Sequence, residues 1–366
     1  MNKVTFSERS GFHSEVRKRV DTYFEANGLS KNADWRMVLK TVLILAWLVG
    51  SYGALLFSTS LTMSIISAFA MSQAFVLVGF NIMHDGLHGS YSSSTRLNRF
   101  VGLSLELVGG SSMLWRYKHN ILHHTYTNIN ELDDDLESPG FLRFSPDRQW
   151  RPWHRFQHWY AFPLYGLMSL SWVAKSDFQK FFTRKIGDYE FPKPTLSESV
   201  LFFVGKMFYF GYLLVIPMFF HPILHVLFFF LLIHFVLGVS LATVFQLAHI
   251  VGHNTFPRAE KGSGEIENEW AIHQVETTAN FAPNSTLAAL YCGGLNFQIE
   301  HHLFPRVCHV HYPAISKIVE DTCQEFQVAY VSYPTVYEAV KEHCHFLSYL
   351  GKEDAVGMTR TPQVVA

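Results

Sequence analysis

Histidines in three short clusters are the residues of this sequence with the clearest chemical potential. The first cluster is His84 and His88, the second is His119, His123 and His124, and the third is His301 and His302 behind Gln298. On an α-helix, residues i and i+4 share a face, and an adjacent residue is rotated by about 100°. A cluster of this kind can supply two ligands to one metal and a third ligand to a second metal. The pattern therefore predicts a site for two metals.

The ligand types narrow the choice of metal. Imidazole suits iron, copper, zinc or nickel. The four cysteines (Cys292, Cys308, Cys323 and Cys344) have no CxxC spacing that would indicate zinc or a disulfide framework. Zinc usually closes at four ligands, whereas about eight histidines suit a pair of redox metals that keep positions for dioxygen. We therefore expect two iron ions (Fe²⁺), with dioxygen as co-substrate.

The composition places this chemistry at a membrane. Hydrophobic residues make up 49% of the 366 residues and charged residues only 16%, against roughly 25% charged in an ordinary globular domain. The net charge of -1 gives no indication of a nucleic-acid partner. Four apolar stretches, at about 37–57, 62–83, 199–220 and 223–248, reach the ~20 residues that a crossing needs. Lys40 and Lys206 lie within the first and third, where a lysine can snorkel to the interface.

The links between these stretches predict the topology. Residues 58–61 and 221–222 form short links without Lys or Arg, so the four transmembrane helices make two hairpins with their tips outside. Both termini and the active site are then cytoplasmic. We expect an all-α polytopic membrane protein whose mainly helical cytoplasmic cap holds a di-metal site.

The expected domain boundaries follow from the same reading. Residues 1–36 form an N-terminal arm, residues 37–320 the catalytic domain, and residues 321–366 a C-terminal helical segment with a loose tail. The apolar stretch 159–173 is short and interrupted by Pro163, so we expect an interfacial or buried helix there.

The three clusters, read with their neighbours, resemble the histidine boxes of membrane-bound fatty acid desaturases. They read HDGLHGSYSSS from His84, WRYKHNILHHTYTNINELDDDLE from Trp115 and GGLNFQIEHHLFP from Gly293. Their order, spacing and hydropathy fit from the start of the second span to about residue 320. The resemblance implies an oxidoreductase in which a di-iron centre uses dioxygen and two electrons to introduce a double bond into an acyl chain.

The third cluster resembles one subgroup more closely. Front-end (delta-5/delta-6-like) acyl desaturases typically have Gln at the position of Gln298, and they insert a double bond between an existing one and the carboxyl end. Many eukaryotic members carry a fused cytochrome b5 domain with an HPGG motif, whereas here His221 and Pro222 are followed by Ile223. The resemblance therefore implies a separate electron donor, either ferredoxin or cytochrome b5 with its reductase. Acyl-CoA, acyl-lipid and acyl-carrier protein stay open as substrates.

The resemblance also suggests residues outside the clusters. An isolated ligand follows the fourth span, and we expect it to be His249. The expected metal ligands are thus His84, His88, His119, His123, His124, His249, His301 and His302. Further candidates, as ligands or as partners of ligands, are Gln298, His253, His273, Asp85 and Glu300. The last two are expected to hydrogen-bond ligating imidazoles, and the acidic run 133–135 is expected to be a solvated loop.

The substrate would be held at two ends. Four basic residues near the second cluster, namely Arg116, Lys118, Arg151 and Arg155, could pair with a phosphate of coenzyme A or a phospholipid, or could attract anionic lipids without specificity. An apolar tunnel would set the position of the double bond. The other histidines match no cluster and are expected to have structural roles: His13, His154, His158, His221, His225, His234, His309, His311, His343 and His345.

Two other classes of reaction stay open. The same di-iron centre could serve an acyl hydroxylase or acetylenase, which differ from a desaturase only in how the substrate radical is resolved. The first cluster, HDGLH, also resembles the HExxH motif of a one-zinc membrane metalloprotease. That reading needs one metal and a general base, and it leaves the second and third clusters unexplained.

Overall fold

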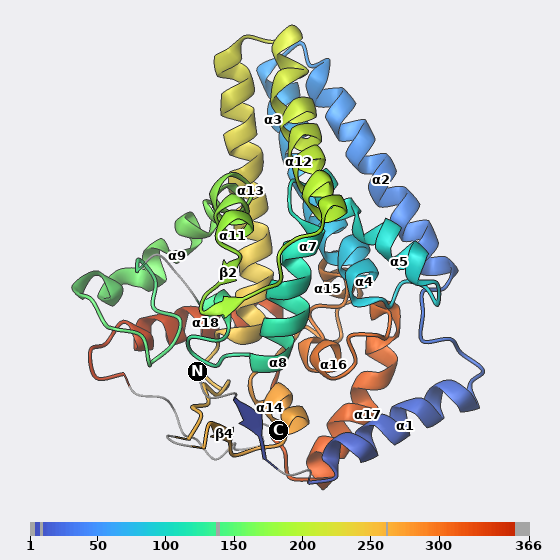
Figure 1. Ribbon diagram of the computed structural model, residues 1–366, viewed down its shortest axis with the longest axis vertical. Helices are drawn as coiled ribbons and strands as arrows, with labels where there is room; N and C mark the ends of the chain where they lie inside the picture. The colour runs from blue at the N-terminus through green and yellow to red at the C-terminus, as the bar shows by residue number, and fades with distance from the viewer. Residues whose placement is uncertain (1–3, 8–9, 137–139, 261–262, 356–366) are drawn as a thin grey trace. The chain divides into compact units, whose positions relative to one another are not determined.

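The computed structural model describes residues 4–7, 10–136, 140–260 and 263–355 (Figure 1). The chain divides into two compact units, each of which is described by itself. We call them the span unit, formed by Asn32–Lys118 and Phe162–Thr243, and the cap unit, formed by Met1–Lys31, His119–Ala161 and Val244–Ala366. Three helices contain a boundary between these ranges: η2 (Arg116–His123), α9 (Gln157–Tyr165) and α13 (Ile223–His249).

Four long helices are apolar enough to cross a membrane, as the sequence predicted. They run over Trp35–Leu56, Leu61–His88, Leu196–Phe219 and Ile223–His249. The first is α2 and the fourth is α13; the second joins α3 (Leu61–Leu77), η1 (Val78–Met83) and α4 (His84–His88), and the third joins α12 (Leu196–Phe210), η6 (Gly211–Val215) and η7 (Pro217–Phe219). Asp34 and Ser60 start the first two helices by accepting hydrogen bonds from the main chain of Arg36 and Met63.

Large apolar side chains cover the outer faces of these helices. Val49 on α2 is 71% exposed, Met207 on α12 is 73% exposed and Leu224 on α13 is 77% exposed. Contiguous apolar surface of this kind is unfavourable in water and typical of contact with lipid. The four helices therefore have the surface, as well as the length, of membrane spans.

A lysine inside the third span is buried. Only 3% of Lys206 is exposed, and its ammonium group donates to the carbonyl oxygens of Gly109 (2.6 Å) and Val173 (3.1 Å) and to the carboxylate of Asp177 (2.7 Å). We expected this lysine to snorkel to the interface. It instead remains inside the span unit because these three acceptors replace its hydration.

Short elements complete the span unit. They are α5 (Thr95–Gly102), α6 (Ser104–Leu107), α7 (Ser112–Trp115), α10 (Met168–Ser171), η5 (Trp172–Ser176), α11 (Asp177–Thr183) and a hairpin of β2 (Lys185–Ile186) with β3 (Tyr189–Glu190). Helices α4 and α5 cross closely at two glycines, because a Cβ on Gly86 would lie 2.6 Å from the main-chain nitrogen of Gly102. The glycine of HDGLH is therefore required by packing. The predicted helix over 159–173 is broken into α9, which contains Pro163, followed by α10 and η5.

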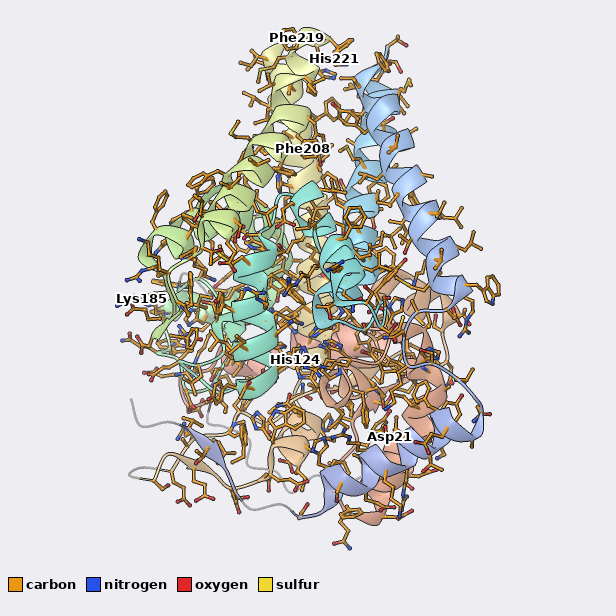
Figure 2. All side chains as sticks on the ribbon, turned by 45° about the vertical axis from the view of Figure 1, so that its right-hand side comes forward. Asp21, His124, Lys185, Phe208, Phe219 and His221 are labelled. Atoms are coloured by element: carbon orange, nitrogen blue, oxygen red, sulfur yellow. The ribbon has the colours of Figure 1, made fainter. Side chains whose placement is uncertain are left out.

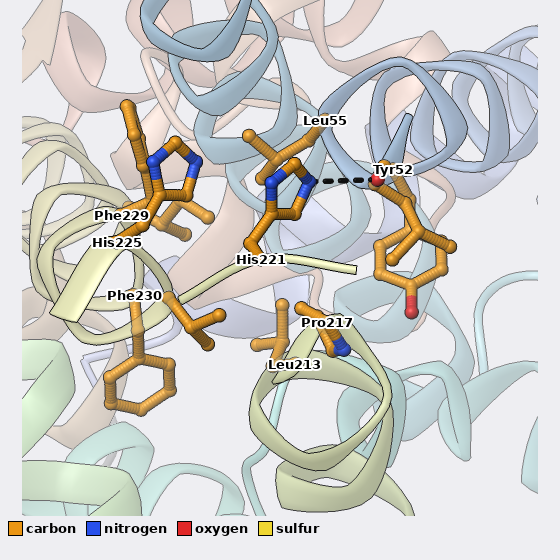
Figure 3. Close-up of a pocket in the computed structure, with 11 residues that line it drawn as sticks. Tyr52, Leu55, Leu213, Pro217, His221, His225, Phe229 and Phe230 are labelled. Atoms are coloured by element: carbon orange, nitrogen blue, oxygen red, sulfur yellow. Dashed lines mark hydrogen bonds between the residues drawn. The ribbon is translucent and has the colours of Figure 1, made fainter. Parts of the chain in front are cut away.

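A small apolar cavity lies in the span unit at the link between η7 and α13 (Figure 3). Leu55, Leu213 and Phe229 line it together with His221 and His225. The rings of these two histidines stack at 4.7 Å, and His221 Nε2 donates to the carbonyl oxygen of Leu56 at 2.9 Å, the bond drawn in Figure 3. Both histidines serve the packing of the hairpin tip.

The cap unit is mainly helical, as expected. Its helices are α1 (Phe12–Ala26), α8 (His124–Tyr126), η3 (Asp134–Leu136), η4 (Pro152–Phe156), α14 (Trp270–Glu276), α15 (Thr286–Cys292), α16 (Gln298–Leu303), η8 (His309–His311), α17 (Tyr312–Glu325) and α18 (Val336–Leu350). Two pairs of two-residue strands are parallel: β1 (Thr5–Phe6) with β4 (Glu265–Ile266), and β5 (Asn280–Phe281) with β6 (Ser332–Tyr333).

Helix α1 belongs to the core of the cap unit. It lies along α17, as Figure 1 shows, and Phe12 and Val16 join Ile299 and Leu303 of α16 in one buried cluster. Phe24, which also lies on α1, belongs to a second buried apolar cluster. Residues 12–26 belong to the segment that we expected to form an N-terminal arm. In the cap unit they support the helix that carries the third histidine cluster, because their buried apolar residues recur every four positions.

Candidate metal centre

The second histidine cluster lies on a π-helix. Segment η2 covers Arg116–His123, and the cluster ends at His124, which Figure 2 labels at the start of α8. A π-helix has an i→i+5 hydrogen-bond pattern, so it brings together residues five apart. Accordingly the Nε2 atoms of His119 and His124 are 3.2 Å apart. The α-helical geometry that we assumed from the sequence would have paired residues four apart instead.

The third cluster lies on α16, all six residues of which are buried. Its rings alternate with those of the second cluster: His302 stacks on His124 at 4.4 Å, and His301 stacks on His119 at 6.0 Å. The turn before α16 needs a glycine, because Gly294 has φ 73° and a Cβ there would lie 2.7 Å from His309 Cβ. The second and third clusters thus form one buried set of rings.

His249, the last residue of α13, joins this set. Its ring centroid lies 4.7 Å from that of His123 and 5.1 Å from that of His302. The amide nitrogen of Gln298 lies 2.9 Å from His249 Nε2. The residue expected to follow the fourth span as an isolated ligand is therefore beside both clusters.

Two overlapping triplets of nitrogen atoms define the candidate centre. Ring nitrogens of His123, His249 and His302 lie within 4.8 Å of one another, as do those of His124, His301 and His302. Two nitrogen ligands of one metal, each at ~2.1 Å, are about 3.0–3.4 Å apart when the angle between them is 90–110°. The separation of 3.2 Å between His119 and His124 falls in this interval. The donor set fits a metal centre.

Hydrogen bonds on the far side of the rings fix their orientation. Both oxygens of Asp133 accept from His123 Nδ1, at 3.1 and 3.2 Å, and Asp133 is only 1% exposed. Gln274 Oε1 accepts from His302 Nδ1 at 2.7 Å. With the Nδ1 atoms protonated in this way, the Nε2 atoms carry the lone pairs that a metal needs. We expected the acidic run 133–135 to be solvated, and this is wrong for Asp133.

The comparison with protein families decides the identity of the chain. Residues 58–334 match the family described as "Fatty acid desaturase". The chain belongs to the fatty acid desaturase family. It is therefore an oxidoreductase, and its four apolar helices make it a membrane protein.

Individual relatives agree with this assignment and with the resemblance to front-end desaturases. The chain is 36% identical to the sn-1 linoleoyl-lipid 6-desaturase of Synechocystis sp. over 96% of its own length and 98% of that protein. It is 40% identical to the acyl-lipid (8-3)-desaturase of Physcomitrium patens, over 94% of this chain and 72% of that protein. It is 32% identical to the acyl-lipid (8-3)-desaturase of Mortierella alpina, over 94% of this chain and 79% of that protein. A metalloprotease has no support from these relatives.

The first histidine cluster of the desaturase lies in the span unit, at the end of the second span. The rings of His84 and His88 are 4.6 Å apart, and both pack edge-on against Trp115, at 5.7 and 5.3 Å. The π-helix η1 immediately precedes His84. Asp85, between the two histidines, is buried. The first cluster thus follows a π-helical segment, and the second lies on one. Such segments are frequent at functional sites.

Three of the further candidates lie away from the candidate centre. His253 is exposed, and its ring lies 6.3 Å from that of Tyr333. His273 is fully buried against Phe6, and desolvation lowers its pKa to about 3. The carboxylate of Glu300, which we expected to hold an imidazole, accepts instead from Asn280 (2.8 Å) and Tyr330 (2.9 Å), and burial raises its pKa to about 7.

Sequence reasoning missed several residues that hold the site together. Tyr312 lies with its hydroxyl 3.2 Å from His301 Nδ1. Gln274 was passed over in favour of its neighbour His273, although an acceptor beside a buried histidine is a usual partner of a ligand. Asn128 donates to the carbonyl oxygen of His249 at 3.1 Å. The sequence contains no signal for Asn128 and Tyr312, because their partners are distant in the chain.

The four basic candidates for the substrate head group have other contacts. Arg116 pairs with Glu198 at 3.1 Å, and its guanidinium lies over Tyr117. Arg151 and Arg155 lie over the rings of Trp153 and Trp150, at 5.4 and 5.2 Å. Lys118 is partly buried at the end of its unit.

Proposed function

We propose that this protein is an acyl-lipid desaturase that introduces a double bond on the carboxyl side of an existing one, at a centre of two iron ions. The observation that carries the proposal is the interleaving of His119, His123, His124, His301 and His302 with His249. Relatives named as acyl-lipid 6- and (8-3)-desaturases, aligned over nearly the whole chain, support the substrate class.

The proposed ligand set adds the first cluster. His84 and His88 complete the eight histidines, and they are positioned by the end of the second span and by Trp115. Gln298 is proposed as a further metal ligand beside His249. A rotation of its side-chain amide by about 180° would place Oε1 where Nε2 now lies, 2.9 Å from the imidazole. No thiolate takes part, which favours a site for iron with dioxygen over a structural zinc site.

The reaction explains why a metal centre is needed. A methylene carbon is far too weak an acid for any side-chain base, so acid–base catalysis cannot remove its hydrogens. Two iron ions with dioxygen supply the oxidising power for this step when they are bound. The overall change is –CH₂–CH₂– + O₂ + 2 e⁻ + 2 H⁺ → –CH=CH– + 2 H₂O.

The chain itself contributes orientation and exclusion of water. Asp133 and Gln274 hold the Nδ1 protons of His123 and His302, which keeps the opposite nitrogen of each ring basic. The six proposed ligands in the cap unit are all buried: His119, His123, His124, His249, His301 and His302. Burial keeps water away from an oxidant that would otherwise be quenched. Apolar side chains of the spans are proposed to hold the acyl tail.

The electron donor and the topology belong to the same proposal. The two electrons come from a separate donor, either ferredoxin or cytochrome b5 with its reductase. Both termini and the metal centre lie on the cytoplasmic side, since the hairpin tips carry no Lys or Arg. Arg116, Lys118, Arg151 and Arg155 are proposed to contact the lipid head group on that side.

The test is the fatty-acid profile of a host that expresses the chain and is supplied with linoleate. Gas chromatography with double-bond localisation should show a new acid with an additional double bond nearer the carboxyl end. The product should be absent with His123→Ala/His124→Ala and retained with His253→Ala, the exposed histidine outside the centre. A hydroxylated or acetylenic product would overturn the reaction type. A product found first in the acyl-CoA pool would overturn the acyl-lipid substrate.

A further inference from the structure

Helix α18 contacts the residues that follow His249, and it lies outside the region that matches the family. The match ends at residue 334, and α18 covers Val336–Leu350. Sequence reasoning assigned this region to a C-terminal segment beyond the catalytic domain. In the cap unit, α18 packs on the residues that directly follow His249, through Glu342, His343 and Phe346.

The end of α13 explains what such a helix can contribute. The last four carbonyl groups of an α-helix have no partner within the helix and must be satisfied from elsewhere. The carbonyl of Ala248 accepts from the main chain of Ala279 at 2.9 Å, and that of His249 accepts from Asn128 (3.1 Å) and Asn254 (3.0 Å). The main chain around the proposed ligand His249 is thus held by side chains rather than by a continuing helix.

The next carbonyl is held by α18. His343 Nδ1 donates to the carbonyl oxygen of Ile250 at 2.7 Å, and His343 is fully buried. Burial lowers the pKa of His343 to about 4, so the ring is neutral at neutral pH and Nδ1 carries the proton for this bond. On either side of it, Glu342 and Phe346 lie against Gly252, where a Cβ would be 2.5 Å from the Glu342 carboxylate.

Helix α18 is itself held rigidly at its C-terminal end. The buried guanidinium of Arg143 donates to the carbonyl oxygens of Leu350 (3.0 Å) and Lys352 (2.9 Å). Gln157 donates to that of Leu347 at 2.8 Å, and Trp150 Nε1 to that of Gly351 at 2.8 Å. A donor on a helix fixed in this way can fix the main chain to which it binds.

We propose that His343 is a positioning residue of the metal centre: its hydrogen bond to Ile250 fixes the end of α13 and so the direction in which His249 presents its ring. This inference rests on the proposed role of His249 as a ligand. It assigns a role to α18 that the family match does not cover, and it gives one of the ten histidines outside the clusters a part in metal binding.

The experiment is a titration of the metal-free full chain in detergent with Co²⁺, followed by its visible absorption. His343→Leu removes the donor and fills the space, and Co²⁺ should bind about tenfold more weakly with a shifted band, by analogy with the loss of other partners of ligands. His343→Asn places an amide donor at the position of Nδ1 and should restore affinity to within about twofold. His345→Leu changes an exposed histidine of the same helix, and should keep the wild-type spectrum.

The outcomes separate the two proposals. Wild-type Co²⁺ affinity in His343→Leu, or an equal loss in His345→Leu, would overturn the positioning role. His343→Gln gives the same test if the leucine variant does not fold, because its amide lies one bond further from the helix and cannot reproduce the 2.7 Å contact. His249→Ala tests the ligand role separately: unchanged Co²⁺ binding there overturns the ligand assignment. Since the readout is metal binding, none of these results depends on the product formed.

Discussion

His234 and His302 are both fully buried histidines of one chain, and their surroundings are opposite in kind. His234 lies in the fourth span with both ring nitrogens taken by hydroxyls, Nδ1 by Ser169 (3.0 Å) and Nε2 by Tyr209 (2.8 Å). His302 has one nitrogen on Gln274, and its ring lies among those of His123, His124 and His249. Burial alone therefore does not mark a ligand. What distinguishes a ligand is the partner of its second ring nitrogen, because a metal needs a lone pair that does not already accept a hydrogen bond from a hydroxyl.

The largest expected effect comes from replacing each of these two histidines with alanine. His302→Ala should remove both metal binding and product, a loss above about 100-fold because it deletes a proposed ligand whose ring lies among those of His123 and His124. His234→Ala should leave the metal content unchanged and lower stability by about 1–3 kcal/mol for each hydroxyl left unsatisfied. Metal analysis and thermal unfolding of the two purified variants make the comparison. Loss of metal from His234→Ala would contradict it.

The carboxylate behind His123 should have the next largest effect. Asp133→Ala removes the acceptor of His123 Nδ1 and also of the main chain of Asn128 (2.9 Å), so metal affinity should fall about 10–100-fold. Asp134→Ala, one residue further along, is the matched control and should stay within about threefold of wild type. Co²⁺ titration of both variants provides the measurement. Equal losses would mean that the acidic run acts by charge alone.

Exchanges at Gln274 should separate the hydrogen bond from the shape of the side chain. Gln274→Leu removes the acceptor at His302 Nδ1 and should weaken metal binding about tenfold. Gln274→Glu keeps an acceptor at the same place and should retain most of the binding. If the two variants behave alike, the orientation of His302 does not depend on this bond. Iron content after anaerobic reconstitution is the readout.

The smallest expected effect concerns the hydrogen bond between Tyr209 and His234. Tyr209→Phe removes one hydroxyl from a fully buried pair and keeps the ring that packs against Gly109. Stability should fall by about 1 kcal/mol, with metal content and product unchanged. A change in the product of Tyr209→Phe would show that this pair takes part in the reaction.

Much of this arrangement could be predicted from the sequence. Apolar length gave the four spans, and the ligand types of the three clusters predicted a shared metal site, of which the cap unit assembles the second and third clusters with His249. The π-helical geometry of η2 could not be predicted, because the pairing of His119 with His124 depends on one main-chain hydrogen-bond pattern that propensities do not encode. The partners Asn128 and Tyr312 were missed for another reason. Each meets its histidine only after segments distant in the chain have packed, so local sequence patterns do not indicate the contact.

The burial of α1 marks a similar limit. Its residues are charged on one face, and the sequence predicted only an N-terminal arm there; in the cap unit Phe12 and Val16 join Ile299 in a buried cluster. An amphipathic helix indicates that one face is buried, but the surface that it covers is decided by the tertiary fold.

The most direct test of the account is the iron content of the full chain reconstituted anaerobically with Fe²⁺. We predict two iron ions per chain, lost in His123→Ala/His124→Ala and retained in His234→Ala. One metal ion per chain, or two that survive the change at His123 and His124, would contradict the di-iron centre built from these histidines.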